Sequence, residues 1–362
     1  MKRYGNLFDK ICDIENIKNA HRQARKDKSF YREVKKIDNN VDYYAKKIRN
    51  MLLSKSYKIK SSGYTSFMKN DKGKDREIFK LSYYPHRLIQ WAIMLQIQHI
   101  FLNTFISNTF SSIPNRGIHL ASNKLRRDLK QDEENTKYCL KIDVKKFYPN
   151  INHSICKSLI RRKIKDKDLL WLMDNIIDSM DGDKGIAIGS LFSQWMGNFY
   201  MSYFDHWIKE DLSIKYYYRY CDDIVILHED KTFLHELKTK IERYLNSNLK
   251  LTVKDNWQVF PTRTRGIDFV GYRHFGDYIL LRKTTAKQLK RRMKTIRNRC
   301  HNRIEMSYSD WCSINSYRGW IIWCDGFNLT KKYIEPLIPY TNEYYRKNIK
   351  GGGKNVCIST VE

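Results

Sequence analysis

The 362-residue sequence predicts an α+β fold with an antiparallel sheet, and three observations lead to this prediction. Residues 216–227 (YYYRYCDDIVIL) have strand-forming runs on both sides of two aspartates, which is typical of a tight hairpin. Residues 138–143 (YCLKID) alternate apolar and charged side chains, as a strand ending at an acid does. Residues 151–184 carry Leu and Ile at core-like helical spacing, which predicts two helices between the strands.

Other elements follow in chain order. Residues 1–60 are Lys-rich with apolar side chains at helical intervals, so we expect a basic helical extension. An Asn-Asp-Lys-Gly turn predicts a hairpin within 61–78. We expect a helix that begins at Ser193 and Gln194 and ends near Ile208, with Asp205 and His206 in structural roles. Residues 230–248 predict a helix, and residues 249–254 a period-two strand.

The C-terminal third is strongly basic. The segment that begins at Arg282 (RKTTAKQLKRRMKTIRNRCHNRI) predicts a cationic helix, and Tyr317 lies in a second, aromatic-rich helix. Gly351 begins a stretch that we expect to be a loose tail.

The hairpin tip carries the chemistry. Asp222 and Asp223 lie between apolar strand residues, where like charges repel and raise each other's pKa unless a cation neutralises them. The alternative is an ordinary turn with two solvated aspartates, but no Gly, Pro or Asn opens the turn. Asp143 supplies a third carboxylate from the other predicted strand. Three such acids can hold two Mg²⁺ ions, which clamp the attacking and leaving oxygens of a phosphoryl transfer.

These motifs resemble the conserved boxes of reverse transcriptases, in the same order. Tyr220-Cys221-Asp222-Asp223 matches their YxDD box, and Asp143 followed by Tyr148 matches their first catalytic box. The segment 185–194 (GIAIGSLFSQ) is similar to the substrate-handling box between them. Most reverse transcriptases have a Pro-Gln-Gly…Ser-Pro form there. The variant in this chain resembles enzymes of diversity-generating retroelements and bacterial defence-associated (unknown group) reverse transcriptases, and the resemblance spans roughly residues 70–335.

The resemblance implies a right-hand polymerase fold with fingers, a palm built on an antiparallel sheet, and a helical thumb. The implied limits are 1–60 for the N-terminal extension, 61–135 for the fingers, 136–275 for the palm with fingers-side helices 151–184, 276–348 for the thumb and 349–362 for a flexible tail. The implied reaction is RNA-directed DNA synthesis, in which a primer 3′-oxygen attacks a dNTP and pyrophosphate leaves.

The resemblance also assigns site residues. Asp143, Asp222 and Asp223 are the implied catalytic acids, and two Mg²⁺ ions are implied at Asp143, Val144, Asp222 and Asp223. Implied substrate-binding residues are Lys74, Arg76, Arg116, Tyr148, Gly189, Ser193, Gln194 and Lys254.

Each role has a physical reason and an ordinary alternative. Arg76 suits bidentate phosphate contact and Lys74 a point charge, although both residues would also suit a solvated hairpin face. The Tyr148 ring would exclude a 2′-hydroxyl, or simply fill core. Lys254 would protonate the leaving pyrophosphate, or lie exposed. Gly189 allows close backbone approach.

Composition agrees with a nucleic-acid partner. The chain has 68 Lys and Arg against 39 Asp and Glu, a net charge of +29 that is spread along its length and attracts polyanions. Its 25 Tyr, 16 Phe and 8 Trp offer rings on which bases stack, although most will be core. We expect an RNA template, such as a dedicated non-coding RNA, together with cDNA and dNTPs. A small accessory protein or a second reverse transcriptase is a further expected partner.

Location is predicted from what the sequence lacks. MKRYGNLFDK at the N-terminus has no apolar run, so we expect no signal peptide. No stretch of about 20 apolar residues predicts a membrane span. The eight cysteines form no paired CxxC motif and are expected to be free thiols in the cytoplasm.

Two settings stay open: a diversity-generating retroelement and antiphage defence. A catalytically silent RNA-binding scaffold with a palm fold is the alternative function, and the intact acids argue against it. An RNA-templated RNA polymerase is a further alternative, which Tyr148 disfavours.

Overall fold

The computed structural model describes residues 2–71 and 74–350, and the chain divides into two compact units. The first unit contains Met1–Gly117, Leu140–Leu227 and Lys231–Val259. The second contains Ile118–Cys139, His228–Asp230 and Phe260–Glu362. The predicted limits of fingers, palm and thumb stay a prediction. The predicted tail overlaps residues 351–362, which lie outside the described residues.

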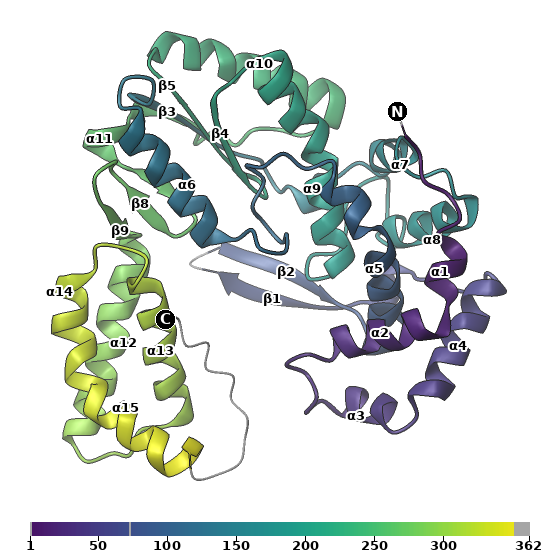
Figure 1. Cartoon of the computed structure of the whole chain (residues 1–362), viewed down its shortest axis with the longest axis horizontal. Helices are drawn as coiled ribbons and strands as arrows, with labels where there is room; N and C mark the ends of the chain where they lie inside the picture. The colour runs from purple at the N-terminus through teal and green to yellow at the C-terminus, as the bar shows by residue number, and fades with distance from the viewer. Residues whose placement is uncertain (1, 72–73, 351–362) are drawn as a thin grey trace. The chain divides into compact units, whose positions relative to one another are not determined.

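The N-terminal segment is helical, as predicted. Its helices are α1 (Phe8–Cys12), α2 (Ile14–Ala24), α3 (Arg32–Asp38) and α4 (Val41–Leu53). Asp13 caps α2 and Asn40 caps α4, because each side chain accepts a bond from a backbone amide of the first turn. Helix α2 packs against α5 (Leu88–Leu102), an apolar helix that is buried along much of its length (Figure 1).

The predicted hairpin near residue 70 is present. Strand β1 (Thr65–Asp71) pairs antiparallel with β2 (Lys74–Lys80). The amide of Phe79 in β2 donates to the carbonyl of Ile188 at 3.0 Å. This bond attaches the base of the hairpin to the loop that precedes α9 (Leu191–His206).

The central four-stranded sheet, most of whose residues belong to the first unit, has the order β4-β5-β3-β6. Its strands are β3 (Tyr138–Asp143), β4 (Tyr216–Tyr220), β5 (Asp223–His228) and β6 (Gln258–Pro261). Strands β4 and β5 form the predicted hairpin, with Tyr220 opposite Asp223. The order places β5 next to β3, so the hairpin tip and the end of β3 meet at one end of the two inner strands.

The helices predicted around the strands of this sheet are present. The two helices expected between the strands are α7 (His153–Arg161) and α8 (Lys167–Ile177), capped by Asn152 and Asp166. Helix α9 begins two residues earlier than predicted, because the Ser190 hydroxyl caps it by accepting the Ser193 amide. Helix α10 (Lys231–Leu249) buries one apolar stripe, as predicted for this segment.

The strand predicted over 249–254 is wrong. Helix α10 extends to Leu249, and Lys250 then adopts a left-handed φ of 52°. The amides of Lys250 and Leu251 donate back to the last turn of the helix, which ends it in a tight cap. Only Val253 remains to form a bridge, with Val144.

The second unit combines a small sheet with helices. It contains α6 (Ile118–Gln131) and the antiparallel sheet β7 (Ile267–Phe269), β8 (Tyr272–His274) and β9 (Ile279–Leu281). Gly271, in the β7–β8 turn, has a φ of +90°, and a Cβ there would lie 2.5 Å from the Trp320 ring. Besides α6, the α-helices of this unit are α11 (Thr262–Arg265), α12 (Lys283–His301), α13 (Tyr308–Ile321), α14 (Phe327–Leu329) and α15 (Ile338–Tyr345).

The cationic helix expected after Arg282 is α12, and the aromatic-rich helix is α13. Buried Asp310 at the start of α13 accepts from Arg292 and Arg299 of α12, each at 2.8 Å, and so joins the two helices.

Short 3₁₀ and π turns complete the elements. They span Ser61–Gly63, Tyr83–Arg87, Tyr148–Asn150, Trp207–Asp211, Thr330–Ile334, Glu335–Leu337 and Arg346–Lys350. Among the described residues, no helix is long and apolar enough to cross a membrane.

The helices and antiparallel sheets together confirm the predicted α+β class.

Candidate active site

The β4–β5 turn contains only Cys221 and Asp222, because Tyr220 and Asp223 already pair across the hairpin. Cys221 has a φ of 59°, in the left-handed region that costs a non-glycine residue about 1–3 kcal/mol. Such a conformation persists only where neighbouring groups hold it. Burial and the neighbouring Asp222 charge raise the pKa of the Cys221 thiol to about 12, so it stays protonated at neutral pH.

Asp222 lies beside the end of β3. The Val144 amide donates to the Asp222 carbonyl at 3.1 Å, which links the turn to the residue that follows Asp143. Burial raises the pKa of the Asp222 carboxyl to about 6, and the charges of Asp143 and Asp223 add to this rise, whereas Lys254 opposes it. Two of the predicted acids, Asp143 and Asp222, therefore form a partly buried like-charge pair.

Two lysines form ion pairs with Asp143 and Asp223. The Lys254 ammonium pairs with the Asp143 carboxylate, and the Lys254 amide donates to the Asp143 carbonyl at 2.8 Å. The Lys141 ammonium pairs with Asp223. The prediction placed Lys254 near the site but missed Lys141. The signal was present, because residues two apart in a strand share a face and Lys141 precedes Asp143 by two.

The donor set fits a hard divalent cation at the Asp143–Asp222 pair. Carboxylate oxygens are the ligands that Mg²⁺ prefers, and a cation there would relieve the repulsion that raises the Asp222 pKa. The Val144 side chain is apolar and fully buried, so only its main-chain carbonyl could contribute. Over residues 2–71 and 74–350, no group of three or more His, Cys, Asp or Glu side chains is arranged to hold a metal ion. The assignment of Asp223 as a third ligand stays a prediction.

The raised Asp222 pKa predicts a pH-dependent stability. In metal-free protein the folded state holds the Asp222 proton more tightly than the unfolded state, so this group's contribution falls as pH rises from about 4 to 6. A shift of about two units corresponds to about 3 kcal/mol. Asp222→Asn should therefore gain about 2–3 kcal/mol over wild type between pH 4 and pH 7.5, measured by urea unfolding in EDTA. The exposed Asp211→Asn control should show no such gain, and equal pH profiles for wild type and Asp222→Asn would contradict the prediction.

Tyr148 lies against the turn that carries Asp222. Its hydroxyl is 3.4 Å from the Cys221 sulfur, and its ring contacts Phe147 with centroids 5.2 Å apart. A Cβ at Gly197 of α9 would lie only 3.0 Å from the Tyr148 ring. Burial raises the pKa of the Tyr148 phenol well above its ordinary value. The ring is thus fixed from two sides next to the candidate acids.

The residues predicted at the start of α9 mostly contact neighbouring segments of the chain. Gly189 has a φ of +112°, and a Cβ there would lie 3.2 Å from the Phe79 carbonyl, so its close approach in this structure is to β2. The Ser193 side chain is buried and bonds to the Ser190 hydroxyl at 2.8 Å. Gln194 is half-buried in the first turn. Substrate contact by these three residues stays a prediction.

A cavity of about 170 Å³ lies beside Gly189. The sequence analysis did not predict it as a binding site. It is bounded by α3, β2, the start of α5 and the loop before α9, and its lining includes Lys28, Tyr31, Glu33, Lys80, Arg87, Gln90, Trp91, Gly189 and Ser190. Among the described side chains, Arg87 Nε and Trp91 Nε1 are buried there without a hydrogen-bond partner. Burial lowers the pKa of Arg87. The Arg87…Gln90 spacing was visible in the sequence, but nothing local indicated that these residues line a cavity.

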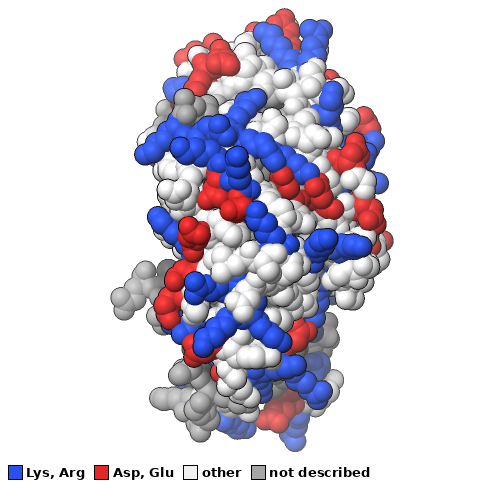
Figure 2. Space-filling model, turned by 90° about the vertical axis from the view of Figure 1, so that its right-hand side faces the viewer, with Lys and Arg blue, Asp and Glu red and all other residues white. Residues whose placement is uncertain are grey.

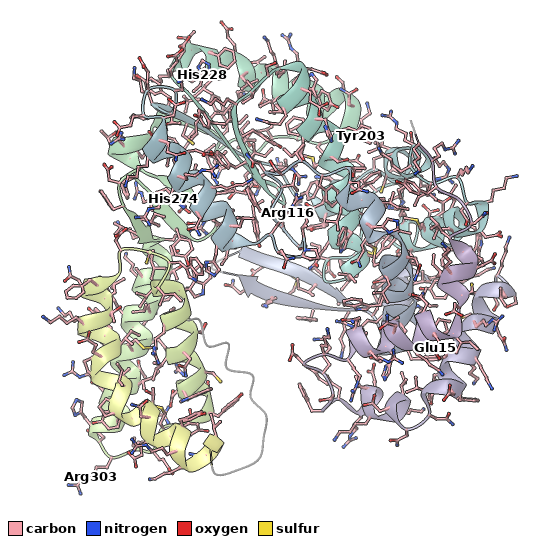
Figure 3. All side chains as sticks on the ribbon, in the orientation of Figure 1. Glu15, Arg116, Tyr203, His228, His274 and Arg303 are labelled. Atoms are coloured by element: carbon pink, nitrogen blue, oxygen red, sulfur yellow. The ribbon has the colours of Figure 1, made fainter. Side chains whose placement is uncertain are left out.

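The remaining predicted cations lie in two places. Lys74 and Arg76 belong to β2, opposite Asp71 and Lys69, and their side chains lie outside the described residues. Arg116, labelled in Figure 3, lies in the loop before α6 and donates from Nη1 to the Ile106 carbonyl at 2.7 Å. That bond holds the loop, and contact between Arg116 and a nucleotide stays a prediction.

Comparison with known proteins identifies related sequences and structures. The family model described as "Reverse transcriptase (RNA-dependent DNA polymerase)" matches residues 68–274, more than half of the chain. Protein YkfC of Escherichia coli (strain K12) is 22% identical over 235 residues, which cover 61% of this chain and 53% of that protein. The chain thus spans about half the length of this curated relative.

Two solved telomerase structures are also similar. Apo telomerase from Candida tropicalis has a TM-score of 0.48 at 12% identity, covering 84% of this chain and 63% of that one. Telomerase from Candida albicans in complex with a fragment of telomeric RNA has a TM-score of 0.45 at 12% identity, covering 71% and 52%. The family match together with the observed elements gives a right-hand polymerase fold, as the sequence predicted.

Proposed function

Because the chain belongs to the reverse transcriptase (RNA-dependent DNA polymerase) family, we propose that it synthesises cDNA on an RNA template. The observation that carries this proposal is the partly buried Asp143–Asp222 pair where the inner strands β3 and β5 meet. A like-charge pair of this kind is costly unless it serves to hold a cation.

Asp143 and Asp222, with the Val144 carbonyl, would hold Mg²⁺, and Asp223 would support them. When bound there, two Mg²⁺ ions would supply charge neutralisation for the attacking and leaving oxygens of the phosphoryl transfer. The chain itself contributes position and charge. Lys254 holds Asp143 in place and carries a proton on Nζ beside it, from which the leaving group can be protonated. Lys141 holds Asp223.

The cavity beside Gly189 is a candidate wall of the nucleotide site. Arg87 and Trp91, whose buried Nε and Nε1 atoms have no hydrogen-bond partner, line this cavity, and Tyr31 and Trp91 provide rings for stacking. The segment 189–194, predicted to contact substrate, borders this cavity at Gly189 and Ser190. Lys74, Arg76 and Arg116 would add phosphate contacts.

The charge of the chain supports a polyanionic partner. Lys and Arg are spread over the face in Figure 2, with Asp and Glu between them. A net charge of +29 favours binding to an RNA template and its cDNA product, with a strong dependence on salt.

The biological setting is either a diversity-generating retroelement or antiphage defence. A variable repeat near the gene would favour the first, and a toxin or a non-coding RNA gene would favour the second. The second candidate function is an RNA-binding scaffold without catalysis. The mutual repulsion of Asp143 and Asp222 argues against it, because a scaffold has no need to retain such a pair.

Primer extension tests the proposal. Purified protein is incubated with a DNA primer on an RNA template, all four dNTPs and Mg²⁺. We expect extension that requires the template and stops when EDTA is added. Binding of the primer–template without extension, over a range of Mg²⁺ and Mn²⁺ concentrations, would contradict the proposal and favour the scaffold.

A further inference from the structure

A buried ion pair lies directly behind the turn that carries Asp222. Arg219 of β4 and Asp205 of α9 are both fully buried, with 0% exposure. Arg219 donates from Nε to Asp205 Oδ1 at 2.7 Å and from Nη2 to Oδ2 at 2.5 Å. This is the bidentate geometry in which Arg holds a carboxylate most firmly.

The network around this pair is complete. Besides Asp205, Arg219 donates from Nη1 to the Cys221 carbonyl at 3.0 Å and to Asn198 Oδ1 at 3.3 Å, and from Nη2 to the Asn198 carbonyl at 3.4 Å. All five guanidinium N–H groups therefore have acceptors. Asp205 also accepts from the hydroxyls of Thr109 and Tyr217. A lysine cannot reproduce this set, because its single ammonium lacks the fork.

The bond to Cys221 has a specific consequence for Asp222. The Cys221 carbonyl belongs to the peptide that precedes Asp222, and Cys221 holds the left-handed φ of 59°. The peptide that follows Asp222 is held by the Val144 amide. Both peptides that flank Asp222 are thus fixed, one by Arg219 and the other by the strand that carries Asp143.

Stability alone does not account for this arrangement. A buried ion pair often contributes no more than apolar side chains of similar volume, because desolvation offsets the attraction. Its value lies in the conformation that it selects. We propose that Arg219 is a positioning residue, which through the Cys221 carbonyl fixes the orientation of the Asp222 carboxylate toward Asp143. This inference rests on the proposed function and adds a residue that acts without touching substrate.

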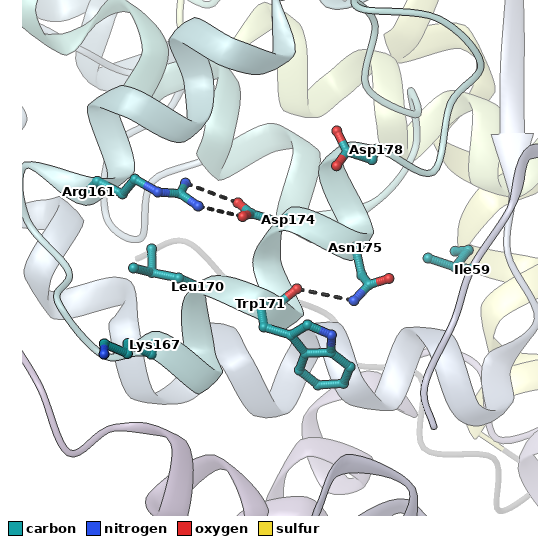
Figure 4. Close-up of a pocket in the computed structure, with 8 residues that line it drawn as sticks. All are labelled: Ile59, Arg161, Lys167, Leu170, Trp171, Asp174, Asn175 and Asp178. Atoms are coloured by element: carbon teal, nitrogen blue, oxygen red, sulfur yellow. Dashed lines mark hydrogen bonds and ion pairs between the residues drawn. The ribbon is translucent and has the colours of Figure 1, made fainter. Parts of the chain in front are cut away.

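Arg219→Lys is the direct test, because it keeps the positive charge beside Asp205 but cannot also hold Cys221 and Asn198. Arg161→Lys is the control for the loss of an Arg fork away from the turn. Arg161 of α7 forms a bidentate pair with Asp174 of α8, at 3.1 and 2.5 Å, which is partly exposed beside the surface groove drawn in Figure 4. Both variants break one Arg fork, but only the first touches the turn.

Three quantities are measured below the melting temperature of each variant. We expect Arg219→Lys to lower the single-turnover rate of dNTP incorporation at saturating primer–template by about 100-fold, as a displacement of about 1 Å does. Mn²⁺ affinity without nucleic acid, followed by electron paramagnetic resonance, should weaken by about tenfold. The dissociation constant for primer–template should stay within about twofold of wild type. Arg161→Lys should match wild type in all three.

The outcomes separate this inference from the proposed function. A wild type that neither extends primers nor binds Mn²⁺ overturns the proposed function and the inference with it. An active wild type with Arg219→Lys equal to Arg161→Lys in rate and Mn²⁺ affinity overturns the positioning role alone. If Arg219→Lys does not fold, the double variant Asp205→Asn/Arg219→Gln, which buries no unpaired charge, takes its place under the same criteria.

Discussion

Asp222→Ala is expected to abolish DNA synthesis, with a loss of more than about a thousandfold in rate. Asp222 is the acid whose pKa is raised by burial and by Asp143, so its removal leaves Asp143 as the only carboxylate of the pair. Nucleic-acid binding should persist, because the substitution removes a negative charge and no cation. Primer extension and filter binding on the same preparation measure both quantities.

Asp211→Ala is the control for Asp222→Ala. Asp211 is exposed at the end of the turn that follows α9, and its loss should leave the rate unchanged. Extension by Asp222→Ala at the rate of this control would show that Asp222 takes no part in the reaction. It would then contradict the proposed role of the acid pair in DNA synthesis.

Tyr148→Ala should relax the choice between dNTP and NTP. If the ring blocks a 2′-hydroxyl, the ratio of kcat/KM for dNTP over NTP should fall by about 10- to 200-fold, the range that one steric contact supplies. The ring is fixed by Gly197 and the Cys221 sulfur, so an incoming sugar cannot displace it easily. Tyr148→Phe keeps the ring and loses only the hydroxyl, so it should retain the wild-type ratio.

The Tyr148→Ala variant also loses the packing of a half-buried ring. Its loss should cost less than the roughly 3–5 kcal/mol of a fully buried aromatic ring, and the ratio is compared at a temperature where circular dichroism shows both variants folded. An RNA-templated RNA polymerase gives a different result, in which wild type already uses NTP and Tyr148→Ala leaves that use unchanged. That outcome would refute the steric gate.

Much of the fold was predictable because its elements follow local patterns. The hairpin 216–227 and the strand ending at Asp143 show strand composition and period-two alternation, and both are present. Helices α7 and α8 follow from apolar spacing and good caps. The strand expected over 249–254 failed because alternation in six residues cannot indicate where the preceding helix ends, and Lys250 ends it in a left-handed conformation.

The sequence predicted the acidic residues of the site but not most of their side-chain partners. Acidic motifs in order identified Asp143 and Asp222, but side-chain partners depend on which strands become neighbours. The pairing of Lys141 with Asp223 requires β3 to lie next to β5. Asp205 was expected to be structural, and it is buried, yet its bond to Arg219 and the link to Cys221 could not be predicted from the sequence. Likewise, the unpartnered donors of Arg87 and Trp91 are recognised only once the surrounding cavity exists.

The most direct test of RNA-templated DNA synthesis uses the protein in its own setting. The gene is expressed with its native flanking DNA, and the RNA and DNA that copurify with the protein are sequenced beside an Asp222→Ala/Asp223→Ala variant. We predict discrete cDNA, complementary to a copurified RNA, with the wild type alone. Scattered substitutions at template adenines would indicate a retroelement, and uniform or repetitive cDNA would indicate defence. Bound RNA with no cDNA from either protein would contradict the account.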